Sequence, residues 1–124
     1  CCIDTSGSIS QEVFSKFISE LKGILCSYPI IKCQLFYADI KCFGPYEVDL
    51  HDELPIPEGG GGTDFCPFFK AVADQETYTL PICIYLTDGY GQYPEKSNYE
   101  TLWVITPGGI ESEYIPFGNV CRLI

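Results

Sequence analysis

The sequence predicts an α/β domain whose central sheet is mostly parallel, has about six strands and carries few covering helices. Two observations support this prediction. Short apolar runs of strand length alternate with segments of helical periodicity, an order typical of parallel strands joined by helical crossovers. Oxygen-rich turns also follow the first and the central apolar runs, where loops gather at the carboxyl ends of parallel strands.

The composition is that of one globular domain. The chain has 124 residues, of which 46% are hydrophobic and 15% aromatic, so it can bury a core of its own. It contains no methionine and opens three residues before its first oxygen-rich turn, inside the expected first strand. We therefore expect residues 1–124 to be a single domain that is a fragment of a longer protein, with a shortened first strand.

The first predicted elements are a strand and a long amphipathic helix. Residues 1–3 have the composition of the end of a buried strand. Helical periodicity begins at Ile9, where Ser8 or Ser10 can cap the helix, and Pro29 is expected to end it. The apolar positions that recur every three to five residues are Ile9, Val13, Phe14, Phe17, Ile18, Leu21, Ile24 and Leu25.

Two strands, a glycine loop and a second helix follow. Residues 30–38 predict a strand, and residues 41–50 predict an edge strand that Gly44-Pro45 either bends or interrupts with a turn. Four consecutive glycines, at 59–62, exclude regular structure there. Residues 65–73 then predict a shorter helix with a proline in its first turn.

The last third of the chain predicts three strands. Residues 80–86 form a nearly continuous apolar run, as expected of a central strand covered on both faces, and residues 101–106 form another. Residues 120–124 indicate a final strand broken by Arg122. Between positions 89 and 100 no helical periodicity occurs, so we expect a loop there.

The charge of the chain excludes two classes of partner. Seventeen acidic residues against seven basic ones give a net charge of −10. Nucleic acids and anionic membranes both require a basic surface, so we expect neither as a partner. No apolar run approaches the roughly 20 residues that span a bilayer.

The eight cysteines indicate buried or reduced thiols rather than a disulfide framework or a zinc site. Four lie in apolar strand-like runs, no C-x-x-C spacing occurs, and His51, expected to be exposed, is the only histidine. We therefore expect reduced cysteines and a cytoplasmic location. Cys66 lies in the first turn of a helix, which favours a thiolate, although a buried thiol is the preferred interpretation. The four strand cysteines are Cys1, Cys2, Cys33 and Cys83.

Three turns offer oxygen ligands to a hard divalent cation such as Mg²⁺. The hydroxyls of Ser6, Ser8 and Thr63 could bind the cation directly. The carboxylates of Asp4 and Asp88 could bind it directly or through water. The three turns are Asp4-Thr5-Ser6-Gly7-Ser8, Gly59-Gly60-Gly61-Gly62-Thr63-Asp64 and Leu86-Thr87-Asp88-Gly89.

Each of these turns also has a simpler interpretation. An Asp-x-Ser-x-Ser turn by itself is usually a capped strand–helix loop, and only the combination with the other two turns favours a metal site. Asp64 is expected to cap a helix, with an indirect role beside the ligands as the alternative. Asp39 could hold a ligand in place or be a solvated turn residue.

Taken together, these residues resemble the metal-ion-dependent adhesion site of von Willebrand factor type A (VWA) domains. The resemblance rests on Asp4-x-Ser6-x-Ser8, Thr63 and Asp88, and it extends over the whole chain through Trp103-Val104-Ile105-Thr106-Pro107 and Pro116-Phe117-Gly118. More narrowly, the chain is similar to the VWA-like domain of bacterial proteins that carry a metallopeptidase-like region N-terminal to it.

The resemblance implies a Rossmann-like, three-layer fold that binds Mg²⁺ or Mn²⁺ in preference to Ca²⁺ at those five positions. A carboxylate of a partner protein would complete the coordination. The partner implied is an AAA+ ATPase of the MoxR type or another domain of the same chain. The helix expected in the family between the strands near Leu86 and Leu102 is missing, so the resemblance does not extend to the usual helix-based conformational switch.

Two other functions remain open at this stage. A Mg²⁺ ion beside a glycine-rich loop could support a phosphoester hydrolase or phosphotransferase, and a metal could also serve only to clamp the loops. No lysine, arginine or histidine lies in or beside the three turns, although phosphoryl transfer needs such a cation. We therefore expect a binding module and no enzyme. Tyr90, Tyr93 and Tyr99 could border the binding surface, whereas Trp103 is expected in the core.

Overall fold

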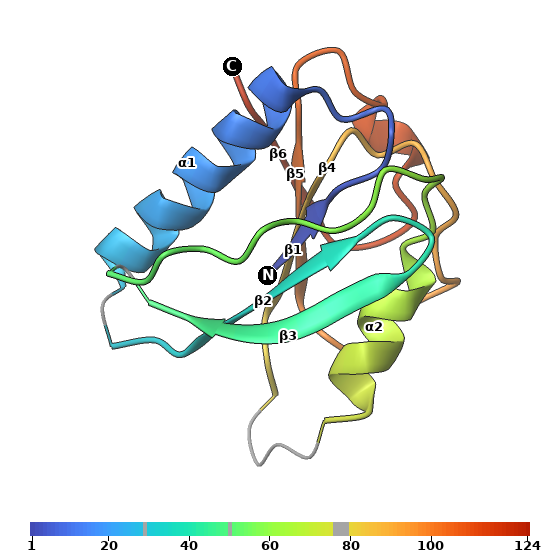
Figure 1. Ribbon diagram of the computed structural model, residues 1–124. Coiled ribbons are helices and arrows are strands. Elements are labelled where there is room, and N and C mark those ends of the chain that lie inside the picture. Colours follow the sequence, from blue (N-terminus) through green and yellow to red (C-terminus); the bar gives the residue numbers. More distant parts are fainter. Residues whose placement is uncertain (29, 50, 76–79) are drawn as a thin grey trace.

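The computed structural model describes residues 1–28, 30–49, 51–75 and 80–124. Its central sheet has the order β3-β2-β1-β4-β5-β6, and every neighbouring pair is parallel except the antiparallel pair β2–β3 (Figure 1). This confirms the predicted sheet. The strands are β1 (Cys2–Asp4), β2 (Cys33–Ala38), β3 (Cys42–Val48), β4 (Cys83–Thr87), β5 (Thr101–Ile105) and β6 (Asn119–Arg122).

Three helical segments accompany the strands: α1 (Gln11–Ser27), α2 (Cys66–Ala73) and the short 3-10 helix η1 (Ser112–Tyr114). The hydroxyl of Ser10 accepts a hydrogen bond from the Val13 N–H at 3.2 Å and caps α1. The expected helix terminator, Pro29, lies outside the described residues. In α2 a proline occupies the first turn, as predicted.

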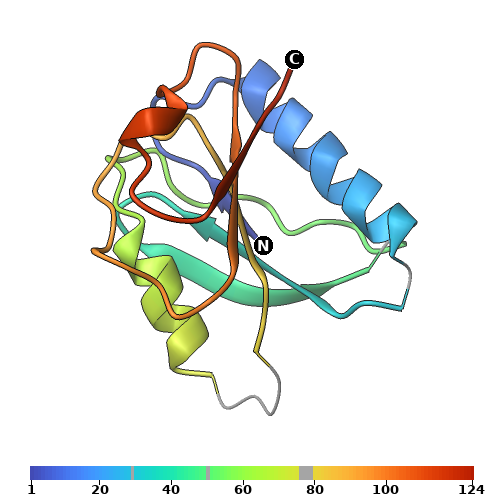
Figure 2. The same ribbon diagram turned by 180° about the vertical axis from the view of Figure 1, so that it is seen from behind.

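The helices cover opposite faces of the sheet, which gives three layers (Figures 1 and 2). Successive strand residues point to opposite faces, so Cys2 packs in the core on the α2 side and Ile3 packs in the core on the α1 side. The α1 face is mainly aliphatic, and the α2 face is rich in aromatic rings. Those rings include Phe65, Phe68, Phe69, Tyr85 and Trp103.

The structure decides between two expectations for the edge strand and corrects one for the last strand. Of the two alternatives for Gly44-Pro45 it confirms the bend, since β3 continues through both residues and the β2–β3 register shifts opposite them, between Leu35 and Tyr37. Arg122 does not break the last strand but is its final residue, paired with Ile105. Residues 89–100 contain no helix, as predicted.

The sheet topology determines where a ligand site can form. The connection from β1 passes through α1 on one face, whereas the connection into β4 passes through α2 on the other. The strand order therefore reverses between β1 and β4, and loops diverge at their carboxyl ends to leave a crevice. The described residues contain no helix that is long and apolar enough to cross a membrane.

Candidate functional site

Asp4 is the buried centre of the candidate site at the carboxyl end of β1. Its side chain has 0% exposure, and both oxygens accept hydrogen bonds. Oδ1 accepts from the Ser6 N–H at 2.8 Å, and Oδ2 accepts from the Thr87 hydroxyl at 2.6 Å. The Thr87 hydroxyl in turn accepts from the Gly89 N–H at 3.0 Å. Asp4 thus connects the loop after β1 to the end of β4.

A second, partly buried set of hydrogen bonds joins the same two loops. The hydroxyls of Ser6 and Ser8 lie 3.2 Å apart. Ser8 donates to Oδ2 of Asp88 at 2.8 Å, and Oδ1 of Asp88 accepts from the Tyr90 N–H at 3.1 Å. The structure therefore brings four of the five predicted ligand residues together, namely Asp4, Ser6, Ser8 and Asp88.

Thr63, the fifth predicted residue, lies on the glycine loop, which contacts both the loop after β1 and the loop after β4. On one side, the Gly7 N–H donates to the Gly61 carbonyl at 2.8 Å. On the other side, Asp64 forms a parallel bridge with Gln92. Within the described residues no hydrogen bond links the Thr63 hydroxyl to the other four side chains. Its role as a ligand stays a prediction.

The other two predicted acids hold backbone in place. Asp39 is only 7% exposed, so it is not a solvated turn residue. Its Oδ2 accepts from the Gly61 N–H at 3.1 Å, and its Oδ1 accepts from the Lys41 N–H at 2.8 Å. Oδ1 of Asp64 accepts from the Cys66 N–H at 2.9 Å, at the start of α2. Asp39 thus positions the glycine loop. Asp64 binds the first N–H of α2, but the residue at the N-cap position is Phe65, so the expected cap is wrong by one residue.

The electrostatics of the site favour a cation. Burial raises the pKa of Asp4, the hydrogen bonds from Ser6 and Thr87 oppose that shift, and the negative charge of Asp88 adds to it. Two carboxylates thus repel each other in a largely buried place, where Asp88 is 9% exposed. A divalent cation between them would relieve both the desolvation and the repulsion.

The remaining donors of this site are neutral. The described residues contain no group of three or more His, Cys, Asp or Glu side chains arranged to hold a metal ion. The predicted set has only two carboxylates, with serine and threonine hydroxyls supplying the other oxygens. Such a set suits Mg²⁺, which accepts neutral oxygen ligands and retains water, better than it suits zinc.

Sequence reasoning missed two residues that shape the site. Thr87 lies directly before Asp88 in the third turn, and its position at a strand end was the available signal. Arg122 is far away in sequence. Its guanidinium donates to the carbonyl oxygens of Gly109 at 3.2 Å and Ile110 at 2.7 Å, and the Ile110 N–H donates to the Asp88 carbonyl at 2.8 Å. Arg122 therefore holds the loop that supports Asp88.

The cysteines and tyrosines near the site are also defined. All eight cysteines are unpaired, and His51 is exposed. Burial and then Asp64 raise the pKa of the Cys66 thiol, so the thiolate that the helix N-terminus favours is not the stable form. Tyr90 is 56% exposed at the surface, whereas Trp103 is fully buried in the core, as predicted. Tyr93 is half-buried, and its hydroxyl donates to the Gly89 carbonyl at 2.7 Å.

Comparison with known families agrees with this architecture. A family model described as VWA-like domain (DUF2201) matches residues 1–124. No curated protein and no solved structure matches the chain.

Proposed function

The chain belongs to the family of VWA-like domains (DUF2201), and on that basis we propose that it is a metal-dependent protein-interaction module. Mg²⁺ or Mn²⁺ is held at the top of the sheet, and a carboxylate of a partner protein completes its coordination. The proposed ligands are Asp4, Ser6, Ser8, Thr63 and Asp88.

The observation that supports this proposal best is the hydrogen bond between Ser8 and Asp88. It joins residues 80 positions apart and ends a chain of hydrogen bonds that runs from the Asp4 carboxylate through the Ser6 N–H and the Ser6 and Ser8 hydroxyls to Asp88. The Ser6 and Ser8 hydroxyls and the Asp88 carboxylate now bond to one another, and a cation beside them would attract the same lone pairs more strongly. Because several ligands are neutral hydroxyls, much of the cation's charge would remain for an incoming Asp or Glu.

The surroundings of the site favour binding over phosphoryl transfer. Arg122 contacts the loop that supports Asp88, and its guanidinium already bonds to two carbonyl oxygens and to the Ser112 hydroxyl. It is thus committed to holding a loop, whereas phosphoryl transfer needs a cation that faces the developing charge. We propose that the domain itself is not an enzyme.

The finer assignments follow from the resemblance. We place the chain in the bacterial, cytoplasmic subgroup that is attached to a metallopeptidase-like region. Its partner is then a MoxR-type AAA+ ATPase or another domain of the same polypeptide. The net charge of −10 restricts that partner further. Long-range repulsion disfavours an acidic surface, so the partner presents one acid within neutral or basic surroundings.

Thermal unfolding with and without Mg²⁺ tests the cation site. At a Mg²⁺ concentration 100 times the Kd, binding should add about 2.7 kcal/mol to the free energy of unfolding. Ser8→Ala and Asp88→Asn should lose that increment. Ser8 is exposed, so its variant should still fold. Asp74→Ala, an exposed acid at the end of α2, is the matched control and should respond like the wild type.

The outcomes separate the three functions. An unchanged Mg²⁺ response in both site variants contradicts the proposed ligands. If Mg²⁺ stabilises the domain but a pull-down of partners from lysate is the same with Mg²⁺ and with chelator, the metal only clamps the loops. Mg²⁺-dependent hydrolysis of a generic phosphoester that Asp88→Asn abolishes would establish the enzyme instead.

A further inference from the structure

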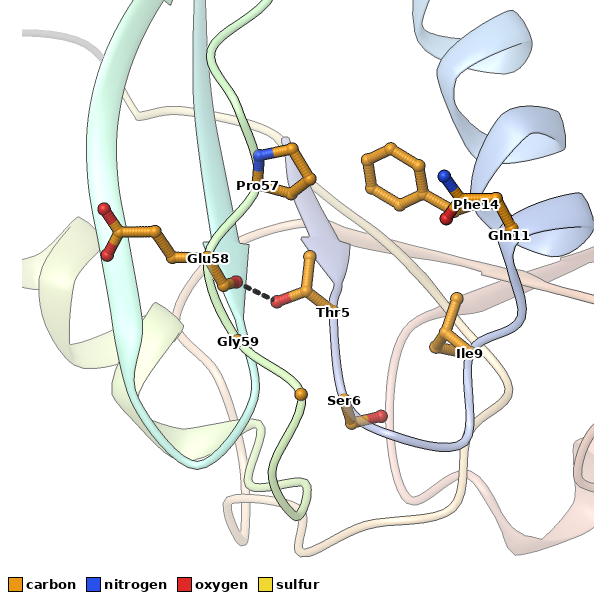
Figure 3. A pocket seen from close by; sticks show the side chains of 9 residues that line it. Thr5, Ser6, Ile9, Gln11, Phe14, Pro57, Glu58 and Gly59 are labelled. Carbon is orange, nitrogen blue, oxygen red and sulfur yellow. Dashed lines mark hydrogen bonds between the residues drawn. The ribbon is translucent and has the colours of Figure 1, made fainter.

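A groove runs from the candidate cation site along helix α1. It consists of two open depressions of about 320 and 340 Å³ that share Phe14 and Pro57 as lining residues. The first depression includes Ser6, and the second extends along the helix to Lys22. Figure 3 shows the first depression, with Phe14 facing Pro57 across it. We call this continuous feature the α1 groove.

The wall opposite the helix is an extended segment, residues 53–60, that is tied to the sheet. The buried Tyr37 hydroxyl donates to the Pro55 carbonyl at 2.8 Å. The Thr5 hydroxyl donates to the Glu58 carbonyl at 2.6 Å (dashed in Figure 3), and the Gly60 N–H donates to the Thr5 carbonyl at 2.7 Å. The groove is therefore formed before any ligand binds, which lowers the entropic cost of binding.

The middle of the groove is apolar. Phe14 and Ile18 are four residues apart on α1, so they lie on one side of the helix, and both are half-buried. Ile56 on the opposite wall is 87% exposed. Its neighbour Pro57 lines both depressions. These side chains offer contacts to apolar side chains of an occupant.

The far end of the groove is acidic, because Asp52 and Glu53 line the far depression. Glu58 lines the depression beside the cation site, but its carboxylate points away from Phe14 (Figure 3). Lys22 is the single basic residue among the lining residues of either depression. With a chain charge of −10, this distribution favours an occupant whose far end is basic.

The length of the groove sets the spacing of the occupant's charges. Gln11 and Lys22 line its two ends on the helix. At a rise of 1.5 Å per residue, they are about 16 Å apart along the axis. An extended peptide covers that distance with about five residues.

We propose that the α1 groove binds an extended segment of a partner protein that carries Asp or Glu at one end and Lys or Arg about five residues away, with an apolar side chain between them. The acid enters the cation site, so the proposal rests on the proposed function. The groove adds the recognition of the rest of the segment, with the basic end beside Asp52 and Glu53 and the apolar side chain between Phe14 and Ile56.

Fluorescence polarisation with labelled hexapeptides tests this proposal. The probe peptides are Asp-Ser-Leu-Ser-Leu-Arg, its reverse Arg-Leu-Ser-Leu-Ser-Asp, and Asp-Ser-Leu-Ser-Leu-Glu. In the presence of Mg²⁺, one of the two arginine peptides should have an affinity at least about threefold higher than that of the glutamate peptide. The reason is that Asp52 and Glu53 would repel the terminal glutamate. Equal affinities, or no binding of any peptide, overturn the proposal.

Matched variants locate the binding. Ile56→Asp and Glu53→Lys should weaken the arginine peptide about threefold to tenfold. Both positions are exposed, so these variants should fold. Ile82→Asp and Glu95→Lys, also exposed but away from the groove, should bind like the wild type. If both groove variants bind as tightly as these controls, the groove is not the site.

Chelator distinguishes this proposal from the proposed function. If chelator abolishes binding but the groove variants match the controls, the cation site stands and the groove proposal fails. If the groove variants lose binding and chelator has no effect, the groove stands and the cation bridge fails. If size-exclusion chromatography shows that the wild type self-associates and Ile56→Asp does not, the occupant is a second copy of this chain and the proposal is overturned.

Discussion

Two threonines at neighbouring strand ends should respond in opposite ways to the same substitution. Thr87 is the last residue of β4, and Thr106 directly follows the neighbouring strand β5. The Thr106 N–H donates to the Thr87 carbonyl at 3.1 Å. The Thr87 hydroxyl is fully bonded, as a donor to Asp4 and as an acceptor from Gly89. The Thr106 hydroxyl is buried and has no partner among the described residues. Valine keeps the shape of threonine and removes the hydroxyl.

The magnitudes follow from those contacts. Thr87→Val removes a hydrogen bond to a carboxylate, about 1.5–3 kcal/mol, and leaves the buried Gly89 N–H without its acceptor. We expect a total loss of about 3 kcal/mol. A chain of 124 residues unfolds with an entropy of about 0.26 kcal/mol per kelvin, so the melting temperature should fall by about 12 °C. Thr106→Val removes only an unpaired hydroxyl and should be neutral or stabilising by up to about 1 kcal/mol.

Urea unfolding in metal-free buffer, followed by fluorescence, measures both free energies. Trp103 is the only tryptophan and is fully buried, so its emission reports loss of the core. Thr87→Ser keeps the hydroxyl and serves as the control, with an expected loss of about 1 kcal/mol for the missing methyl group. If Thr87→Val costs no more than Thr106→Val, the hydrogen bonds of Thr87 do not stabilise the fold and our reasoning is wrong.

Three further predictions concern nearby groups. Burial and then the Asp64 carboxylate raise the pKa of the Cys66 thiol, so Asp64→Asn should lower that pKa. Iodoacetamide should then label Cys66 of the variant faster at pH 8, as followed by mass spectrometry. An unchanged labelling rate contradicts the assigned role of Asp64. Gly89→Ala should cost about 2 kcal/mol or more in urea unfolding, because its φ of +84° is strained for alanine and the new methyl group meets Ile110. The pKa of Tyr93 is raised to about 12, chiefly by burial. Ultraviolet absorbance should therefore show one tyrosine that titrates near pH 12, and this titration should be absent in Tyr93→Phe. The stabilisation from the Tyr93 hydroxyl should be present below about pH 10 and lost as the pH rises toward 12.

Local patterns in the sequence were sufficient to predict most elements of the fold. The apolar residues of α1 recur at helical spacing because the helix buries one side. The apolar residues of β4 and β5 are consecutive because these strands are covered on both faces. Both patterns can be recognised in the sequence alone. Where local signals conflict, prediction failed. Arg122 is polar and was expected to break a strand, yet it ends β6, where its side chain reaches two carbonyl oxygens that only the fold brings near.

The sequence by itself determined the α/β class and the oxygen-rich turns, since spacing and residue type are local properties. It identified Asp4, Ser6, Ser8 and Asp88, which the fold then brought together. Only the tertiary structure decided what lies around them. These surroundings are the hydrogen bond from the Thr87 hydroxyl to Asp4, the hydrogen bond from the glycine loop to Asp39, and the groove beside α1. These features depend on contacts between segments remote in sequence, and such contacts exist only after the sheet order is set.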